Sequence, residues 1–89
     1  MSPAEAQALA DVRGFALANR IEYGRHARER MQQRGAGRED VRHALVTATS
    51  CEARPEDRWK VAGVDTAGDE LTAIVVLEDG VVVVTLFGD

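Results

Sequence analysis

The sequence has little of what several common classes of protein require. Cys51 is the only cysteine among 89 residues, which excludes intramolecular disulfides and a zinc finger built on cysteine pairs. The longest apolar run, Val81–Phe87, has the length of a strand and falls far short of the roughly 18–20 residues of a membrane-spanning helix. The N-terminus carries neither the basic nor the apolar segment of an export signal. We therefore expect a cytoplasmic protein with no membrane partner.

The composition predicts one folded domain. Hydrophobic residues make up 45% and charged residues 29% of the chain, as in ordinary globular proteins. A chain of 89 residues has room for one hydrophobic core, and this one shows no repeat, linker or low-complexity stretch. We therefore predict a single domain over residues 1–89.

The charge is unevenly distributed along the chain. The formal net charge of −4 has the wrong sign for a protein that binds nucleic acid over its whole surface. Residues 20–43, however, hold seven arginines against four acidic residues, which is a net charge of +3. A basic segment on an acidic body can bind one anion locally. The charge pattern thus permits a phosphate site in this segment.

Capping signals and apolar spacing predict two to three helices in the N-terminal half. A helix begins at Ser2, with Glu5 in the reciprocal position of a capping box, and fades near residue 19. A second helix is predicted over residues 26–34, where a glycine follows. A third comes next, with Asp40 as its reciprocal cap and a clear apolar stripe.

The C-terminal half has the patterns of strands. The predicted strands cover residues 50–54, 58–65, 71–77 and 81–87. Asp79 and Gly80 are typical of a two-residue hairpin turn, which would place Thr85 opposite Ile74. The fold class is therefore α+β, with two to three N-terminal helices packed on a three- to four-stranded antiparallel sheet. The first strand is expected to be an exposed edge that can pair with a second copy or with a partner chain.

Three basic side chains share one strip of the second predicted helix. His26, Arg30 and Arg34 follow one another at intervals of four residues, so they lie along one edge of that helix. Like charges at this spacing repel one another unless an anion lies beside them. The anion can be a carboxylate of this chain, an acidic segment of a partner or a phosphate, since the arginine fork suits all three. The candidate carboxylates are Glu52, Glu56 and Asp57.

A second group of candidate residues lies in the predicted sheet. Arg58 and Lys60 share one face of their strand, and Trp59 faces the other side as a candidate core residue. Thr85 is the only polar residue in the last predicted strand. Whether Thr85 faces the same side as Arg58 and Lys60 depends on the preceding turn, because a slip of one residue inverts the faces.

The remaining candidates give no metal site and no cofactor site. No metal-ligand spacing links His26, His43 and Cys51, so we expect neither a bound metal nor a cofactor. Cys51 is interpreted as a small buried hydrophobic residue. His26 has two readings, a hydrogen-bonded structural imidazole at a helix start or a proton-transferring group.

Several motifs resemble a known family. The chain is similar over about residues 20–87 to a small bacterial domain of unknown function with a HAxERxxxRG-like motif, which is thought to be related to the RelE/ParE and MqsR-like toxins. The motifs that carry the resemblance are His26-Ala27-Arg28-Glu29-Arg30-Met31, Arg34-Gly35, Glu39-Asp40-Val41, Ala44-Leu45, Arg58-Trp59-Lys60-Val61, Gly63 and Val83-Val84-Thr85. The resemblance implies a RelE/ParE-like fold and a toxin of a toxin–antitoxin pair, with RNA, free or on the ribosome, and a cognate antitoxin protein as partners.

Two functions follow as hypotheses. The first is a metal-independent RNA endonuclease, with His26, Arg30 and Lys60 as catalytic residues and Arg34, Arg58 and Thr85 binding the phosphate. The second is a non-catalytic toxin or regulatory module whose basic strip receives an acidic segment of a partner protein. A purely structural strip, with the functional surface elsewhere, is the third interpretation.

Overall fold

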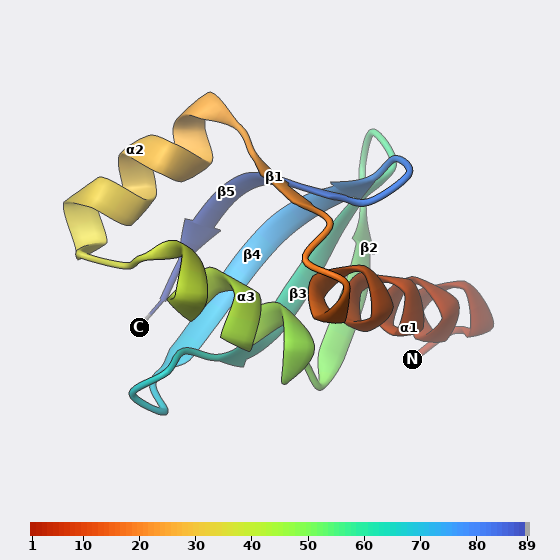
Figure 1. The fold of residues 1–89 in the computed structure, drawn as a ribbon. Coiled ribbons are helices and arrows are strands. Elements are labelled where there is room, and N and C mark those ends of the chain that lie inside the picture. The colour runs from red at the N-terminus through yellow and green to blue at the C-terminus, as the bar shows by residue number, and fades with distance from the viewer. Residues whose placement is uncertain (89) are drawn as a thin grey trace.

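A computed structural model of the protein describes residues 1–88, which form three helices and five strands (Figure 1). In chain order the elements are α1 (Pro3–Leu17), β1 (Ile21–Tyr23), α2 (Arg25–Arg34), α3 (Arg38–Val46), β2 (Ser50–Arg54), β3 (Arg58–Val64), β4 (Glu70–Leu77) and β5 (Val81–Phe87). The predicted α+β class is confirmed, as are the three helices and the four predicted strands, to within one or two residues at their ends.

The sheet of residues 1–88 has five strands in the order β1-β5-β4-β3-β2, and it is mixed. Strands β2 to β5 form the expected antiparallel meander, whereas β1 pairs with β5 in parallel. The expected three- to four-stranded, purely antiparallel sheet is therefore wrong in strand number and in orientation. The sequence did not reveal β1 because three residues are too few for an alternating pattern to stand out. The partner of β1 also lies about sixty residues further along the chain.

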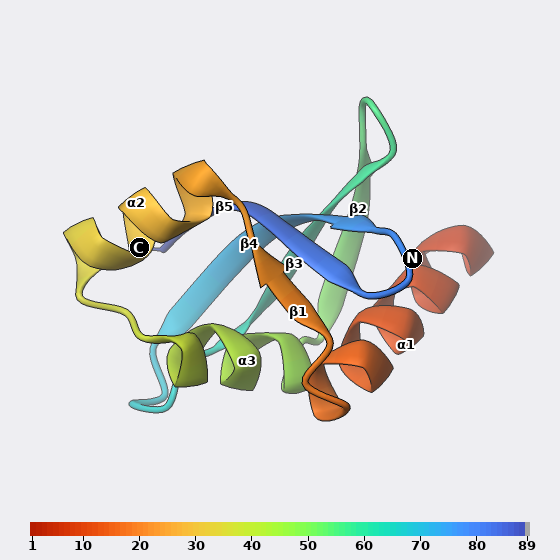
Figure 2. The ribbon, with the colours of Figure 1, turned by 45° about the horizontal axis from the view of Figure 1, so that its top comes forward.

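The two faces of the sheet differ in what covers them. Helices α1 and α3 pack on one face, and α2 lies beside β5 at the edge (Figures 1 and 2). Alternate strand residues on the covered face, such as Val61, Ala73 and Leu86, are at most 3% exposed. No helix within residues 1–88 packs on the opposite face, which we call the open face. Cys51 belongs to the buried core, as predicted, and burial raises the pKa of its thiol.

Gly63 allows α3 to lie directly on β3. A Cβ at this position would overlap the backbone carbonyl of Ala44 and would lie 3.0 Å from Oγ1 of Thr47. Thr47 in turn accepts a hydrogen bond of 3.1 Å from the backbone N–H of Val64. The absence of a side chain at position 63 therefore sets how close this helix comes to the sheet.

Two capping carboxylates tie the helices of the covered face to other elements. Glu5 accepts the backbone N–H of Ser2 within α1, as predicted, and also that of Ala53 in β2 at 2.8 Å. Asp40 caps Gly37 at the start of α3 and also accepts the backbone N–H and the hydroxyl of Thr66. These hydrogen bonds hold the pKa of each carboxyl below its ordinary value. The bond from the Ser2 backbone contributes most for Glu5, and the bond from the Thr66 hydroxyl contributes most for Asp40.

The β4–β5 hairpin reaches the expected register by an unexpected route. Leu77 pairs with Val81, so the loop has three residues and the predicted two-residue turn is wrong. Asp79 and Gly80 both have positive φ, as the sharp reversal requires. A β-bulge then shifts the register by one residue, so that Ile74 pairs with Thr85 as predicted. The bulge compensates for the longer loop.

Candidate functional site

Helix α2 lies along the outer edge of β5, where β1 has ended. The backbone N–H of Gly24 donates to the carbonyl of Val83 at 2.9 Å, and Arg30 Nε donates to the carbonyl of Leu86 at 3.3 Å. Four residues of helix advance about 6 Å and two residues of strand about 6.6 Å. The spacing between successive members of the strip, which are His26, Arg30 and Arg34, therefore matches the spacing between every second residue of β5.

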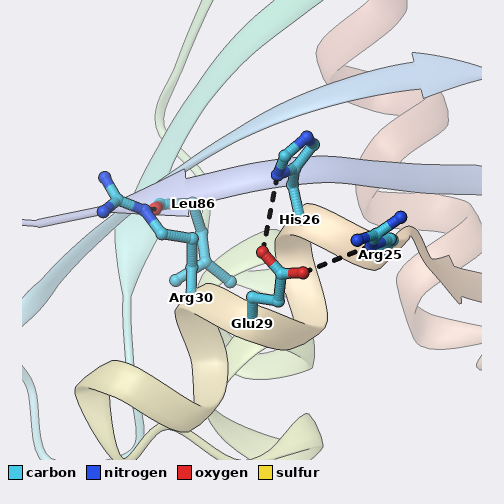
Figure 3. Close-up of polar contacts among 5 residues, drawn as sticks. All are labelled: Arg25, His26, Glu29, Arg30 and Leu86. Carbon is cyan, nitrogen blue, oxygen red and sulfur yellow. Dashed lines mark hydrogen bonds and ion pairs between the residues drawn. The ribbon is translucent and has the colours of Figure 1, made fainter.

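Arg30 is held by one atom and leaves the rest of its guanidinium available. Its Nε donates to the carbonyl of Leu86, which no neighbouring strand reaches (Figure 3). Within residues 1–88 its two Nη atoms have neither a hydrogen bond nor an ion pair. Glu52 lies 3.9 Å from Lys60, and Glu56 lies 4.0 Å from Arg58. Within residues 1–88, neither Arg30 nor Arg34 forms an ion pair, so the predicted bridges to Glu52, Glu56 or Asp57 are wrong. Arg30 still ties α2 to β5, through the Leu86 carbonyl instead of a carboxylate.

His26 stands on the solvent side of the strip and has a carboxylate beside it. Its imidazole is 79% exposed, and its Nδ1 lies 3.7 Å from one oxygen of Glu29. The other oxygen of Glu29 accepts Nε of Arg25 at 3.3 Å (Figure 3). Because the carboxylate lies at the Nδ1 side, Nε2 is the ring atom presented to a ligand. Glu29 is not among the residues predicted for the site, although its i+3 spacing from His26 is visible in the sequence.

One row across the open face joins the two groups of candidate residues. Lys60 pairs with Ile74, and Ile74 pairs with Thr85, so the three side chains lie on the same face. Lys60 and Thr85 are therefore two strand spacings apart, or about 10 Å between backbones. Thr85 precedes Leu86, whose carbonyl binds Arg30, so the row ends beside α2.

Two further residues of the open face flank this row. Arg58 lies one row further along the strands, opposite Val76, and is 43% exposed. Phe87 lies on the other side of the row, and at 36% exposure it is one of the few large apolar side chains that reach solvent in residues 1–88. The ammonium of Lys60 lies 5.8 Å from the centroid of the Phe87 ring.

The structure does not bring Arg34 to this row. Gly88 leaves room for the guanidinium of Arg34, because a Cβ at position 88 would overlap its Nη2. Side chains alternate between faces along a strand, and Phe87 points to the open face. The Arg34 guanidinium therefore lies toward the covered side, apart from Lys60 and Thr85.

The assembled site gathers hydrogen-bond donors suited to an oxyanion, and carboxylates lie beside three of them: Glu29 by His26, Glu52 by Lys60 and Glu56 by Arg58. The residues of this site come from α2, β3 and β5. They are His26, Arg30, Arg58, Lys60, Thr85 and Phe87. Guanidinium, ammonium and hydroxyl groups at the edge of an uncovered sheet are hydrogen-bond donors that match a phosphate. Within residues 1–88, no three His, Cys, Asp or Glu side chains gather as a metal-binding group. None of the helices in this part of the chain is long and apolar enough to cross a membrane.

Comparison with known families identifies the domain. The family described as domain of unknown function (DUF4258) matches residues 23–87. The chain belongs to the DUF4258 family. The expected membership of a domain of unknown function is thus confirmed, while the relation to RelE/ParE and MqsR-like toxins stays a prediction. No curated protein and no solved structure matches the chain.

The DUF4258 match spans the whole candidate site. It begins at the last residue of β1, ends at the last residue of β5 and includes each of the six residues above. Helix α1 lies outside the matched range, although its residues Leu9 and Val12 contribute to the core. The DUF4258 portion of this chain is therefore completed by a helix that packs on the covered face.

Proposed function

We propose that this domain binds single-stranded RNA across the open face of its sheet and cleaves it without a metal ion, as the toxin of a bacterial toxin–antitoxin pair. The supporting observation is the row that runs from Lys60 to Thr85 and ends beside Arg30, whose Nη atoms have no partner within residues 1–88. These three residues are 25 to 55 positions apart in sequence. Their convergence on an uncovered surface is more than helix packing alone requires.

The same surface offers a platform for a base. Single-stranded nucleic acids bind by stacking bases on exposed aromatic rings while cations hold the phosphates. Phe87 is exposed on the open face, and Lys60 lies above its ring at 5.8 Å. A base on Phe87 would place the adjoining phosphate near Lys60, Thr85 and Arg30. This arrangement favours a single strand, because bases in a duplex are already stacked.

The proposed reaction is a transfer within the RNA chain. His26 Nε2 takes the proton of a ribose 2′-hydroxyl, and the 2′ oxygen attacks the adjoining phosphorus. The bond from phosphorus to the 5′ oxygen breaks, and Lys60 supplies the proton that this oxygen needs. Arg30 and Thr85 hold the charge of the pentavalent phosphate. The products are a 2′,3′-cyclic phosphate and a 5′-hydroxyl, and solvent returns His26 and Lys60 to their starting forms.

The test is cleavage of a labelled single-stranded RNA by the purified chain in the presence of a chelator. We expect products with cyclic phosphate ends, and at least a hundredfold loss of rate in His26→Ala, as is usual when a general base is removed. His43→Ala is the matched control, because His43 is exposed and bonds the carbonyl of Val64 on the covered side. Cleavage that persists in both His26→Ala and Arg30→Ala would rule out this mechanism. Circular dichroism of Arg30→Ala must show a folded protein, since that change also frees the Leu86 carbonyl.

A second candidate function is binding without catalysis. In this proposal the same cations receive carboxylates of a partner protein, such as an antitoxin or a cellular target. The 79% exposure of His26 favours it, because most general bases act in sites that exclude water. Salt-sensitive binding of a protein partner by a chain that leaves RNA intact would support this function over the first.

A further inference from the structure

The two edges of the sheet differ in how their backbone groups are satisfied. At the β2 edge, the N–H of Ala53 points outward and donates to a carboxylate oxygen of Glu5 at 2.8 Å. Helix α1 therefore occupies one outward backbone donor of the edge that was predicted to pair with another chain, although four of the five β2 residues are exposed. An edge with an occupied donor is a poorer template for strand addition than an open one. The β1 edge has no such contact within residues 1–88.

The hydrogen bonds of β1 show which of its backbone groups face outward. Arg20 accepts the N–H of Val81 at 3.0 Å, and Gly24 donates to Val83 at 2.9 Å, so the even-numbered positions face β5. Backbone groups alternate in direction along a strand, which turns the N–H and C=O of Ile21 and Tyr23 away from β5. Within residues 1–88, no backbone or side-chain group binds these outward groups.

A basic cleft adjoins this open edge. It has a volume of about 520 Å³ and lies between β1 and α3, lined by Asn19, Ile21, Tyr23, Arg38, Glu39 and Arg42. The guanidinium of Arg38 lies over the Tyr23 ring, 5.2 Å from its centroid. Arg42 is fixed by hydrogen bonds of 2.9 and 3.2 Å to the carbonyls at the end of α1. Neither arginine forms an ion pair within residues 1–88.

We infer that the β1 edge and this cleft bind a short, extended, acidic segment of a partner protein, which adds a sixth strand to the sheet. The unpaired groups of Ile21 and Tyr23 supply backbone hydrogen bonds, as in other strand additions. Alternate side chains of the added strand lie over the cleft. The cleft is lined by two guanidiniums, those of Arg38 and Arg42, and by a single carboxylate, that of Glu39. This excess of positive charge selects an acidic segment over a basic one.

The ends of β1 limit how long the added strand can be. Asn19 has a φ of 59°, which turns the chain out of α1 just before β1. Gly24 starts α2 directly after β1. The added strand is therefore about three to five residues long, and its affinity depends strongly on the charges in the cleft.

The experiment uses a blocked ten-residue peptide of alternating valine and glutamate, titrated into the full-length chain and followed by amide hydrogen exchange. We expect the amides of Ile21 and Tyr23 to exchange rapidly in the free protein and to slow about tenfold or more with the peptide, as ordered strand pairing requires. A peptide with lysine in place of glutamate should leave both amides unchanged. Protection at Cys51 or Ala53 instead, or no protection anywhere, would overturn the inference.

Two charge reversals test the site itself. Arg38→Glu should abolish the protection, whereas Arg54→Glu, an equal reversal on exposed β2, should retain it. Arg38 is the first residue of α3, directly after the N-cap Gly37. An acidic residue in the first turn of a helix is favourable, so the variant should fold. Equal binding by both variants would contradict the inference. Lys60→Ala should retain the protection by the peptide, because it leaves the β1 edge intact. This variant therefore distinguishes peptide binding at the β1 edge from the proposed RNA binding on the open face.

Discussion

The covered and open faces of the sheet are built from the same strands, one residue out of step, yet they differ in which side chains they expose. Val61 and Leu86 on the covered face are at most 1% exposed, while their chain neighbours Lys60 and Thr85 are only half-buried on the open face. The covered face holds the helices and so carries the stability of the fold. The open face is free to carry donors and an aromatic ring. Buried apolar side chains and accessible polar side chains are thereby separated by a single step along each strand.

The largest expected effect is on the covered face. Gly63→Ala should cost about 3 kcal/mol or more, because the new Cβ overlaps a backbone carbonyl that cannot give way. The matched control is Gly14→Ala in α1, where a Cβ meets nothing within 4 Å and where alanine should stabilise the helix by about 0.5–1 kcal/mol. Urea denaturation measures both. Equal effects of the two substitutions would contradict the close packing of α3 on β3.

Neighbouring residues of β5 test the comparison directly. Leu86→Ala removes a fully buried side chain and should cost about 2–5 kcal/mol. Thr85→Ala alters the open face and should change the free energy of unfolding by less than about 0.5 kcal/mol. Binding of single-stranded RNA should show the reverse order, with Thr85→Ala weakening it at unchanged fold. A large loss of stability in Thr85→Ala would show that the open face is covered in solution.

Lys60→Ala should affect RNA binding and leave stability nearly unchanged. Lys60 is 34% exposed in its side chain, and its ion pair with Glu52 at 3.9 Å is a surface pair of small worth. Removing one phosphate contact should lower the slope of log affinity against log salt concentration by about 0.7 for a single strand. Fluorescence anisotropy at several salt concentrations measures the slope. An unchanged slope would remove Lys60 from the phosphate site.

Acid should lower the stability of the fold through Glu5 and Asp40. Hydrogen bonds hold the pKa values of Glu5 and Asp40 below their ordinary values of 4.5 and 3.8. The unfolded chain therefore takes up protons first, so the stability from these carboxylates is complete above those values and is lost as pH falls through and below them. Glu5→Gln and Asp40→Asn should each make the free energy of unfolding depend less steeply on pH in this acidic range. Urea denaturation between pH 7 and pH 2 measures this dependence. A dependence as steep in both variants as in the unmodified chain would contradict the role given to these two carboxylates.

Local features of the fold were predictable from sequence to the extent that their causes are local. The Ser2–Glu5 box and the Asp40 cap join residues three apart, so their hydrogen bonds can be read from spacing. The placement of Thr85 opposite Ile74 came out as predicted only because a bulge offset the longer loop. Neither the loop length nor the bulge leaves a distinct mark among consecutive β-branched residues.

The candidate site was predictable in its members more than in its arrangement. The four-residue spacing of His26, Arg30 and Arg34 placed them on one helix edge, but not on one side of the sheet. Arg34 lies toward the covered side because it stands at the end of the helix against Gly88. The partner of Arg30 is a backbone carbonyl, which every residue possesses, so no residue type marks it in the sequence.

By itself, the sequence determined the helix starts, the alternation of the strands and the basic character of one helix edge, since each depends on neighbours a few residues apart. The tertiary structure alone decided that β1 joins β5 in parallel, that Lys60 and Thr85 share the open face, and that α2 ends their row with Arg30. These pairings join residues 11 to 60 positions apart, and their register follows from which surfaces bury together.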